Sequence, residues 1–176
     1  MQNYYKRKEL IVMKVAIVYY SMSSNTKYVA EKIARCLGAD LISLVPEEQY
    51  PDKGFKKYFW GGKSALMKDK PVLKEYSFDG KKYDVIVFGT PVWASCYTPP
   101  LRTFILDHQQ ELLGKKICAF ACYSGAGSLK ALEKLQKDLE IKSFDVKISL
   151  IDPKDKPTSE KDGQIEEFCK QIKELF

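Results

Sequence analysis

Short apolar runs recur along the chain, separated by longer segments in which apolar residues return every three or four positions. The runs cover residues 14–20, 41–45, 85–90, 117–122 and 147–151. Most of them are continuous and rich in β-branched residues, which is typical of strands buried on both faces of a parallel sheet. The pattern therefore predicts five strands.

The segments between the runs predict helices. Residues 25–37 carry apolar side chains at four-residue spacing, and Gly38 follows in a position that often ends a helix. A helix over residues 99–106 would begin with two prolines, which are favoured in a first helical turn. The apolar positions that predict two further helices are Leu129, Leu132, Leu135 and Leu139, and then Ile165, Phe168, Cys169 and Ile172.

This alternation of strands and helices predicts an α/β fold. Right-handed crossovers place helices on both faces of one open, five-stranded parallel sheet. Residues 1–13 are interpreted as an N-terminal extension, and residues 14–176 as a single domain. Residues 46–80 break the alternation, because they lack a clean strand and carry several aromatic residues. We interpret them as one helix with excursions that link the second and third strands.

Length, composition and charge restrict the class of protein. The chain has 176 residues, 45% hydrophobic and 30% charged, which suits one globular domain. Lys and Arg number 29 against 23 Asp and Glu, giving a net charge of +6. The lysines are spread along the chain rather than gathered in one basic stripe, so we expect a solvated surface and no nucleic-acid partner. No stretch reaches the ~20 apolar residues of a membrane helix, so no membrane span is expected.

The cysteine and histidine content argues against a disulfide scaffold or a metal centre. The five cysteines cannot all pair with one another, and His108 is the single histidine. Cys36, Cys118, Cys122 and Cys169 fall in apolar periodic stretches and are expected to be buried free thiols. For Cys96, a plain loop cysteine is favoured over a redox thiol. This usage favours a reducing, cytoplasmic location.

Polar residues crowd the turn after the first predicted strand. Open α/β sheets bind ligands beyond the carboxyl ends of their strands. Here the sequence Ser21-Met22-Ser23-Ser24-Asn25-Thr26 opens directly into a predicted helix. A helix N-terminus offers free N–H groups and a partial positive charge, and hydroxyls add further donors. One such side chain would suffice as a helix cap, so the surplus predicts a phosphate-binding loop.

Two further loops follow strands at the same edge of the predicted sheet. Residues 90–97 carry Trp93, which is well placed to stack on a flat ring. Residues 123–128 contain Tyr123 and two glycines, whose backbone a ligand can approach closely. Together the three loops predict one crevice with a phosphate cradle, an aromatic wall and bare backbone.

Rival motifs fit the sequence poorly. Gly61-Gly62-Lys63-Ser64 lacks the earlier glycine and the preceding strand that a nucleotide P-loop requires. A phosphotransfer receiver domain needs carboxylates at its strand ends, whereas the first strand ends in two tyrosines. The first loop also lacks the Cys and Arg of a low-molecular-weight cysteine phosphatase.

Three motifs resemble the flavodoxin family. YYSMSSNT at 19–26 resembles its phosphate-binding signature, and GTPVWA at 89–94 with TPPLRTF at 98–104 resembles its second flavin loop and the helix behind it. YSGAG at 123–127 occupies the place of its third loop. The resemblance implies a flavodoxin-like sheet with strand order 2-1-3-4-5, noncovalent FMN as the cofactor and redox chemistry without a metal.

The resemblance also implies roles for individual residues. The FMN phosphate would be held by Ser21, Ser23, Ser24, Asn25 and Thr26, the isoalloxazine would be flanked by Pro91, Val92, Trp93 and Ala94, and its polar edge would meet Tyr123, Ser124, Gly125 and Gly127. No catalytic residue and no metal ligand is assigned.

Two functions follow from this resemblance. The favoured one is transfer of electrons between partner proteins. The alternative is an FMN-dependent oxidoreductase that reduces a small quinone-like acceptor with NAD(P)H or a protein donor, so the sequence leaves open whether the protein is an enzyme. The net charge of +6 departs from the strongly acidic flavodoxins and argues against the basic partners of those proteins.

Overall fold

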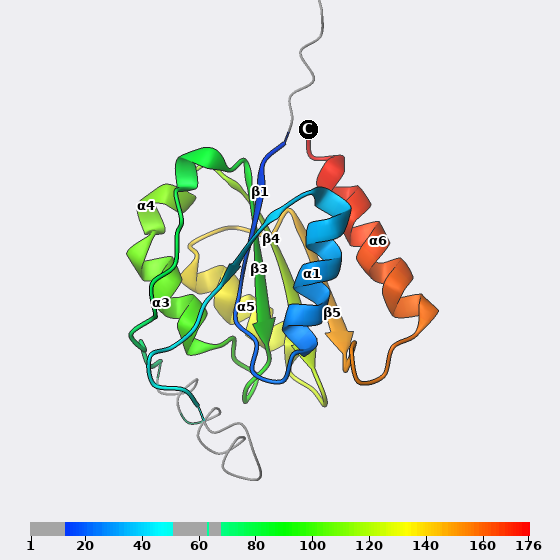
Figure 1. Cartoon of the computed structure of the whole chain (residues 1–176), viewed down its shortest axis with the longest axis horizontal. Coiled ribbons are helices and arrows are strands. Elements are labelled where there is room, and N and C mark those ends of the chain that lie inside the picture. The colour runs from blue at the N-terminus through cyan, green and yellow to red at the C-terminus, as the bar shows by residue number, and fades with distance from the viewer. Residues whose placement is uncertain (1–12, 51–62, 64–67) are drawn as a thin grey trace, which may run out of the picture.

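The computed structural model describes residues 13–50, 63 and 68–176, and within them the predicted strands form one parallel sheet (Figure 1). The strands are β1 (Val15–Tyr19), β2 (Asp40–Ser43), β3 (Val85–Pro91), β4 (Lys116–Tyr123) and β5 (Val146–Ile151). Their order is β2-β1-β3-β4-β5, and every pairing is parallel. The predicted fold class and strand order are confirmed.

The pairing register aligns the carboxyl ends of three neighbouring strands. Tyr19 at the end of β1 pairs with Gly89 of β3, and Pro91 at the end of β3 pairs with Cys122 of β4. The loops that follow β1, β3 and β4 therefore start side by side. They also flank the point between β1 and β3 where the strand order reverses, which is where open α/β sheets bind their ligands.

Helices cover both faces of the sheet (Figure 1). α1 (Asn25–Leu37) and α6 (Ser159–Lys173) pack on one face, while α3 (Pro99–Asp107), α4 (Gln109–Leu112) and α5 (Ser128–Asp138) pack on the other. A short 3₁₀ turn, η1 (Gly80–Lys82), precedes β3. Each face has its own buried core, so the sheet is covered on both sides as its continuous apolar strands require. The four-residue α4 was not among the predicted helices.

Two helices show how directly the periodicity dictates the packing. α1 has the predicted bounds, buries Val29 and Ile33, and is followed by Gly38 at a φ of 63°, whose N–H bonds to the carbonyl of Ala34. In α6 all of the predicted apolar positions are buried. The left-handed conformation favours glycine, which explains why the end of α1 could be predicted to the residue.

Two predictions about single side chains are wrong. Leu129 is 67% exposed, because the buried stripe of α5 runs through Ser128, Ala131, Leu132 and Leu135 and does not include it. Cys36 is exposed, since it lies outside the buried stripe of α1. Three other thiols are buried as predicted, at positions Cys118, Cys122 and Cys169.

Apart from Lys63, the segment between β2 and β3 is described only at its two ends. There, Pro46 and Leu73 form an antiparallel bridge, and the N–H of Lys74 donates to the carbonyl of Val45 at 2.8 Å. The aromatic residues Phe55, Tyr58, Phe59 and Trp60 lie outside the described residues, and so do residues 1–12. The helix expected in this segment and the domain boundary after residue 13 therefore stay predictions.

In the described ranges, no helix combines the length and the apolar character needed to cross a bilayer. The same ranges contain no group of three or more His, Cys, Asp or Glu side chains that could hold a metal ion.

Candidate functional site

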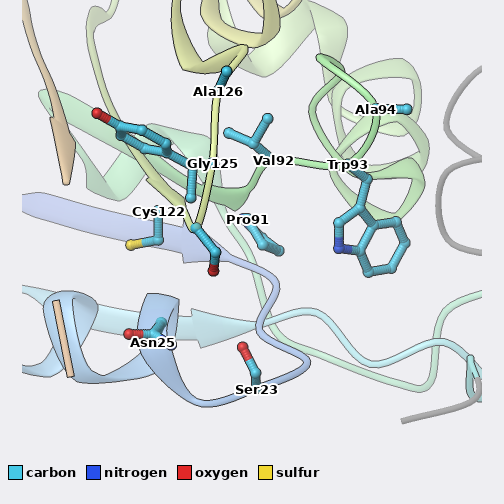
Figure 2. A pocket seen from close by; sticks show the side chains of 11 residues that line it. Ser23, Asn25, Pro91, Val92, Trp93, Ala94, Cys122, Gly125 and Ala126 are labelled. Carbon is cyan, nitrogen blue, oxygen red and sulfur yellow. The ribbon is translucent and has the colours of Figure 1, made fainter. Parts of the chain in front are cut away.

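A cavity of about 250 Å³ lies at the edge of the sheet where β1, β3 and β4 end (Figure 2). It is lined by the loops that follow these strands, through Ser23, Asn25, Pro91, Val92, Trp93, Ala94, Cys122, Tyr123, Ser124, Gly125 and Ala126. Ser21, Ser24, Thr26 and Gly127 are the predicted site residues that do not line it. The three loops singled out by the sequence thus converge on one cavity.

The N-terminus of α1 keeps hydrogen-bond donors open beside this cavity. Ser24 precedes the helix at a φ of 68°, and its side chain makes no capping hydrogen bond. No acidic residue occupies the first turn, and among the described residues no acceptor pairs with the N–H groups of Asn25 and Thr26. Unpaired N–H groups and the positive end of a helix dipole attract an anion.

A serine hydroxyl adds to these donors. Ser21 Oγ accepts the N–H of Lys27 at 3.1 Å. A hydroxyl that accepts one hydrogen bond still has its own proton to donate, so Ser21 can serve the loop and a ligand at once. The loop after β1 therefore offers neutral donors only, from backbone and hydroxyl groups.

The side chains of Asn25 and Thr26 are already engaged within the protein. Asn25 Nδ2 donates to Asp155 Oδ2 at 2.6 Å, and its Oδ1 accepts the N–H of Lys154 at 2.9 Å. Thr26 is buried and its hydroxyl bonds to the Cys122 thiol, although burial still raises the pKa of that thiol to about 12. These two residues have their backbone N–H groups, rather than their side chains, left for an anion.

The loop after β3 is a tight two-residue turn that holds Trp93. The N–H of Trp93 donates to the carbonyl of Cys96 at 2.9 Å, and the N–H of Cys96 donates back at 2.8 Å. Between them Ala94 and Ser95 have φ values of 48° and 56°, as in a type I′ turn. Positive φ costs a residue with a side chain ~1 kcal/mol, and such strain gathers where a group must be held in place.

The residue that closes this turn is packed rather than loose. Cys96 was expected to be a plain loop cysteine, but it is buried. Lys134 of α5 contacts Cys96, and the Lys134 Nζ donates a hydrogen bond to the Cys96 sulfur at 2.9 Å. The turn is thereby attached to the helix that follows β4.

Trp93 forms an aromatic cluster with Tyr20 and Tyr50. Its ring centre lies 5.6 Å from that of Tyr20 and 5.1 Å from that of Tyr50, with interplanar angles of 85° and 79°. Burial, followed by the Coulomb effect of Tyr50, raises the pKa of the Tyr20 hydroxyl, which therefore stays neutral. Figure 2 shows the indole across the cavity from Cys122. Trp93 gives one side of the cavity an aromatic wall suited to a flat ring, and the two tyrosines pack against it.

The loop after β4 closes the other side of the cavity. Gly125 has open space where a Cβ would stand, so its backbone is accessible to a ligand. Gly127 has a φ of 94°, and a Cβ there would lie 2.3 Å from Ser95 Oγ. Gly127 therefore serves the close approach of the loops after β3 and β4, which explains why it does not line the cavity.

A carboxylate beyond β5 fixes the loop after β4. Hydrogen bonds from the Ser124 hydroxyl and from Lys156, whose Nζ lies 2.9 Å from Asp152 Oδ2, lower the pKa of Asp152. The N–H of Asp152 donates to the carbonyl of Tyr123 at 2.8 Å. The loop after β5 thus holds the loop after β4 in place without itself lining the cavity.

Sequence reasoning missed several of these residues. Cys122 and Ala126 line the cavity, Tyr20 belongs to the aromatic wall, and Asp152 and Asp155 anchor two of the loops. A usable signal existed for the aspartates, because they follow the last strand and all five strands end at the same edge. Tyr20 directly precedes the serine-rich loop and could have been found in the same way.

Comparison with known proteins places these observations in a family. A family model described as flavodoxin matches residues 14–154, as the motifs had suggested. No curated protein matches the chain closely enough to count as a relative.

Solved structures share the fold. A flavoprotein from Lactobacillus acidophilus, solved in complex with FMN, is 23% identical with a TM-score of 0.65, covering 86% of this chain and 97% of that one. A protein from Bacteroides eggerthii, proposed to be a flavoprotein, is 23% identical with a TM-score of 0.66 and coverages of 77% and 87%. A flavodoxin from the domain Archaea is 17% identical with a TM-score of 0.56 and coverages of 93% and 98%. At these identities the structural likeness establishes the fold alone.

Proposed function

This chain belongs to the flavodoxin family, and from that premise we propose that it binds FMN noncovalently and transfers electrons between partner proteins. The observation that carries the proposal is the uncapped N-terminus of α1, with its open N–H groups, beside a cavity that has an aromatic wall. A phosphate and a flat ring on one ligand match these two features. The predicted cofactor therefore fits the residues present.

The phosphate would be held by neutral donors. The N–H groups of Asn25 and Thr26 and the hydroxyls of Ser21, Ser23 and Ser24 are the candidates. A hydrogen bond to a charged group contributes a net gain of about 1.5–3 kcal/mol after the exchange with water, so a few such bonds to a phosphate would give substantial affinity. The absence of an acidic side chain from the first turn of α1 removes the main source of repulsion.

The ring would lie between two loops. Pro91, Val92, Trp93 and Ala94 would flank it, while Tyr123, Ser124 and Gly125 would meet its polar edge. Bound FMN supplies the electron-transfer chemistry, and the protein adjusts its potential through stacking, hydrogen bonds and nearby charge. Of the carboxylates near the cavity, Asp152 forms an ion pair with Lys156, whereas Asp155 keeps its charge and accepts a hydrogen bond from the neutral amide of Asn25.

The net charge of the chain and the state of its cysteines support a proposal for its partners and its location. A net charge of +6 favours partner proteins with acidic docking surfaces. All five cysteines are free thiols, as expected of a protein that works in the reducing cytoplasm.

One observation favours the enzymatic alternative. The cluster of Tyr20, Tyr50 and Trp93 lies beside the cavity and offers apolar surface to a flat acceptor such as a quinone. Steady-state oxidation of NAD(P)H in the presence of a quinone tests this alternative. Sustained turnover would support the enzyme and contradict a pure carrier.

The test of FMN binding compares two ligands that differ only in the phosphate. The protein is stripped of any bound flavin and titrated with FMN and with riboflavin, with flavin fluorescence as the readout. We expect FMN to bind at least ~100-fold more tightly, because several charge-assisted hydrogen bonds are lost with the phosphate. Equal affinities would contradict the assignment of the loop after β1, and no binding of either flavin would contradict the proposed function.

A further inference from the structure

A second cavity, of about 430 Å³, lies between α3 and α5 and shares no residue with the first. Its lining residues come from the two helices, from α4, from the chain before α3 and from the chain just after α5; they are Lys68, Lys70, Tyr97, Arg102, Ile105, Leu106, Gln109, Lys137, Asp138 and Glu140. Neither the family nor the proposed function accounts for this cavity.

Arg102 lines the cavity with an incompletely satisfied guanidinium. The residue is only 6% exposed, and its Nε and Nη1 are buried without a hydrogen-bond partner. Asp138 Oδ2 lies 3.5 Å from Nε, which balances the charge without forming a hydrogen bond. That same oxygen already accepts the Tyr97 hydroxyl at 2.5 Å. A buried N–H group without an acceptor costs about 1–3 kcal/mol, so the protein keeps an unmet demand for an acceptor here.

The position of the guanidinium is fixed by its neighbours. Its Cζ lies 4.8 Å from the centre of the Tyr97 ring, and Tyr97 is itself fully buried. A cation held over an aromatic face loses little further freedom when an anion binds. Arg102 is therefore held in place as a fixed positive charge at the wall of the cavity.

Charge and apolar surface around Arg102 define the kind of anion. Four cationic side chains line the cavity, from Lys68, Lys70, Arg102 and Lys137, against two carboxylates, from Asp138 and Glu140. The excess of two positive charges suits a dianion. Ile105 and Leu106 supply an apolar wall beside this head group, and Leu106 is 45% exposed.

We propose that this cavity binds a small organic dianion, with a head group such as a phosphate monoester on Arg102 and an apolar body against Ile105 and Leu106. Arg102 supplies a fixed, largely buried positive charge, while Lys70 and Lys137 supply longer-range attraction. Binding is noncovalent and involves no group of the FMN site.

The test measures binding of phenyl phosphate, benzoate and inorganic phosphate to the full chain, saturated with FMN where FMN binds. Calorimetry gives the affinity, and amide shifts in NMR spectra give the location. We expect phenyl phosphate to bind most tightly, with shifts in α3 and in the last turn of α5. Tighter binding of benzoate would overturn the dianion assignment, and equal binding of inorganic phosphate would overturn the role of the apolar wall. Shifts confined to the loops after β1 and β3, or no saturable binding, would overturn the site.

Substitutions distinguish the contribution of the buried Arg102 to binding from that of the exposed lysines. Arg102→Gln should weaken the binding of phenyl phosphate at least ~10-fold, because the fixed positive charge beside the head group is lost. Lys70→Gln and Lys137→Gln should each weaken it about threefold, since they are solvated charges. Lys130→Gln, two turns earlier on the same helix as Lys137, is exposed and does not line the cavity, so it is the matched control and should change nothing.

The lysine variants still test the proposed site if substitution of the buried Arg102 prevents folding. Should Arg102→Gln fail to fold, unaltered binding in both lysine variants would overturn the site, whereas a threefold loss in both with an unchanged Lys130→Gln would support it. Equal affinity of a folded Arg102→Gln and the parent protein would also overturn it. Flavin fluorescence of the same samples reports on the FMN site separately, so failure of one proposal is distinguishable from failure of the other.

Discussion

The loops after β1 and β3 line the same cavity with different kinds of chemical group. The first offers backbone N–H groups and hydroxyls at the N-terminus of α1, and few of these depend on one particular side chain. The second presents one large side chain, Trp93, from a turn with two residues in the left-handed conformation. The first loop should therefore tolerate single substitutions, while the second should be sensitive to them. The five predictions below test this difference.

The largest effect should come from the contact that supports the strained turn. Gly127→Val places a side chain where a Cβ already lies 2.3 Å from Ser95 Oγ, at a φ of 94°. We expect the free energy of unfolding to fall by about 3 kcal/mol, since overpacking adds to backbone strain. Urea denaturation measures this change. Gly125→Ala is the matched control, because nothing lies within 4 Å of a Cβ there, and an equal loss in both variants would contradict the account.

The next effect concerns the aromatic wall itself. Trp93→Ala should weaken FMN about 10- to 30-fold, because aromatic stacking contributes about 1–3 kcal/mol. Riboflavin binding should weaken by the same factor, since in the proposed site Trp93 would face the ring and not the phosphate. Trp93→Phe keeps an aromatic face and should recover most of the affinity. Unchanged fluorescence titrations for Trp93→Ala would remove this residue from the site.

A third prediction addresses the carboxylate that anchors the loop after β4. Asp152→Asn should lower the free energy of unfolding at pH 7 by about 1 kcal/mol, because hydrogen bonds to a charged acceptor become neutral ones. The pKa of Asp152 is lowered in the folded state, so its contribution is present above the unfolded pKa and is lost as pH falls through the folded value. The difference between the two proteins should shrink below about pH 4. A difference that is constant from pH 7 to pH 3 would contradict this role.

Relief of strain in the turn should produce a smaller change of opposite sign. Ser95→Gly should raise the free energy of unfolding by about 0.5 kcal/mol, since glycine adopts a φ of 56° without strain while gaining freedom in the unfolded chain. Ala126→Gly, at a position in a neighbouring loop that does not itself have a positive φ, should destabilise instead. Thermal unfolding of both variants compares the signs, and destabilisation by Ser95→Gly would argue against a strained turn.

The smallest effect is expected in the first loop. Ser24→Ala should weaken FMN less than about threefold, because Ser24 is exposed and the backbone N–H groups persist. The whole phosphate is expected to contribute far more, as the comparison with riboflavin measures. A loss as large as that of Trp93→Ala would erase the difference between the two loops.

Much of the fold could be predicted because local rules agree with the tertiary structure. Continuous apolar strands, four-residue helical spacing and Gly38 fixed the sheet and the bounds of α1. The convergence of the loops on one cavity followed from strand ends that share an edge.

The remaining features depend on tertiary contacts that no local pattern encodes. The turn at Ala94 and Ser95 uses residues that rarely adopt positive φ, so its geometry could not be expected from their identity. Leu129 looks like a core residue in sequence, yet the orientation of α5 exposes it. Arg102 lies in a helix that begins with two prolines, and nothing in the local sequence indicates that its side chain is buried.

The neutral character of the first loop has a consequence for how the protein would respond to salt. Exposed charges lose their attraction within a screening length of about 8 Å at physiological ionic strength, whereas hydrogen bonds from backbone N–H groups and hydroxyls lose little. FMN held at the N-terminus of α1 would stay bound as salt rises, while docking through a surface of net charge +6 would weaken. A rise in ionic strength would then release the protein from its partners while FMN stays bound.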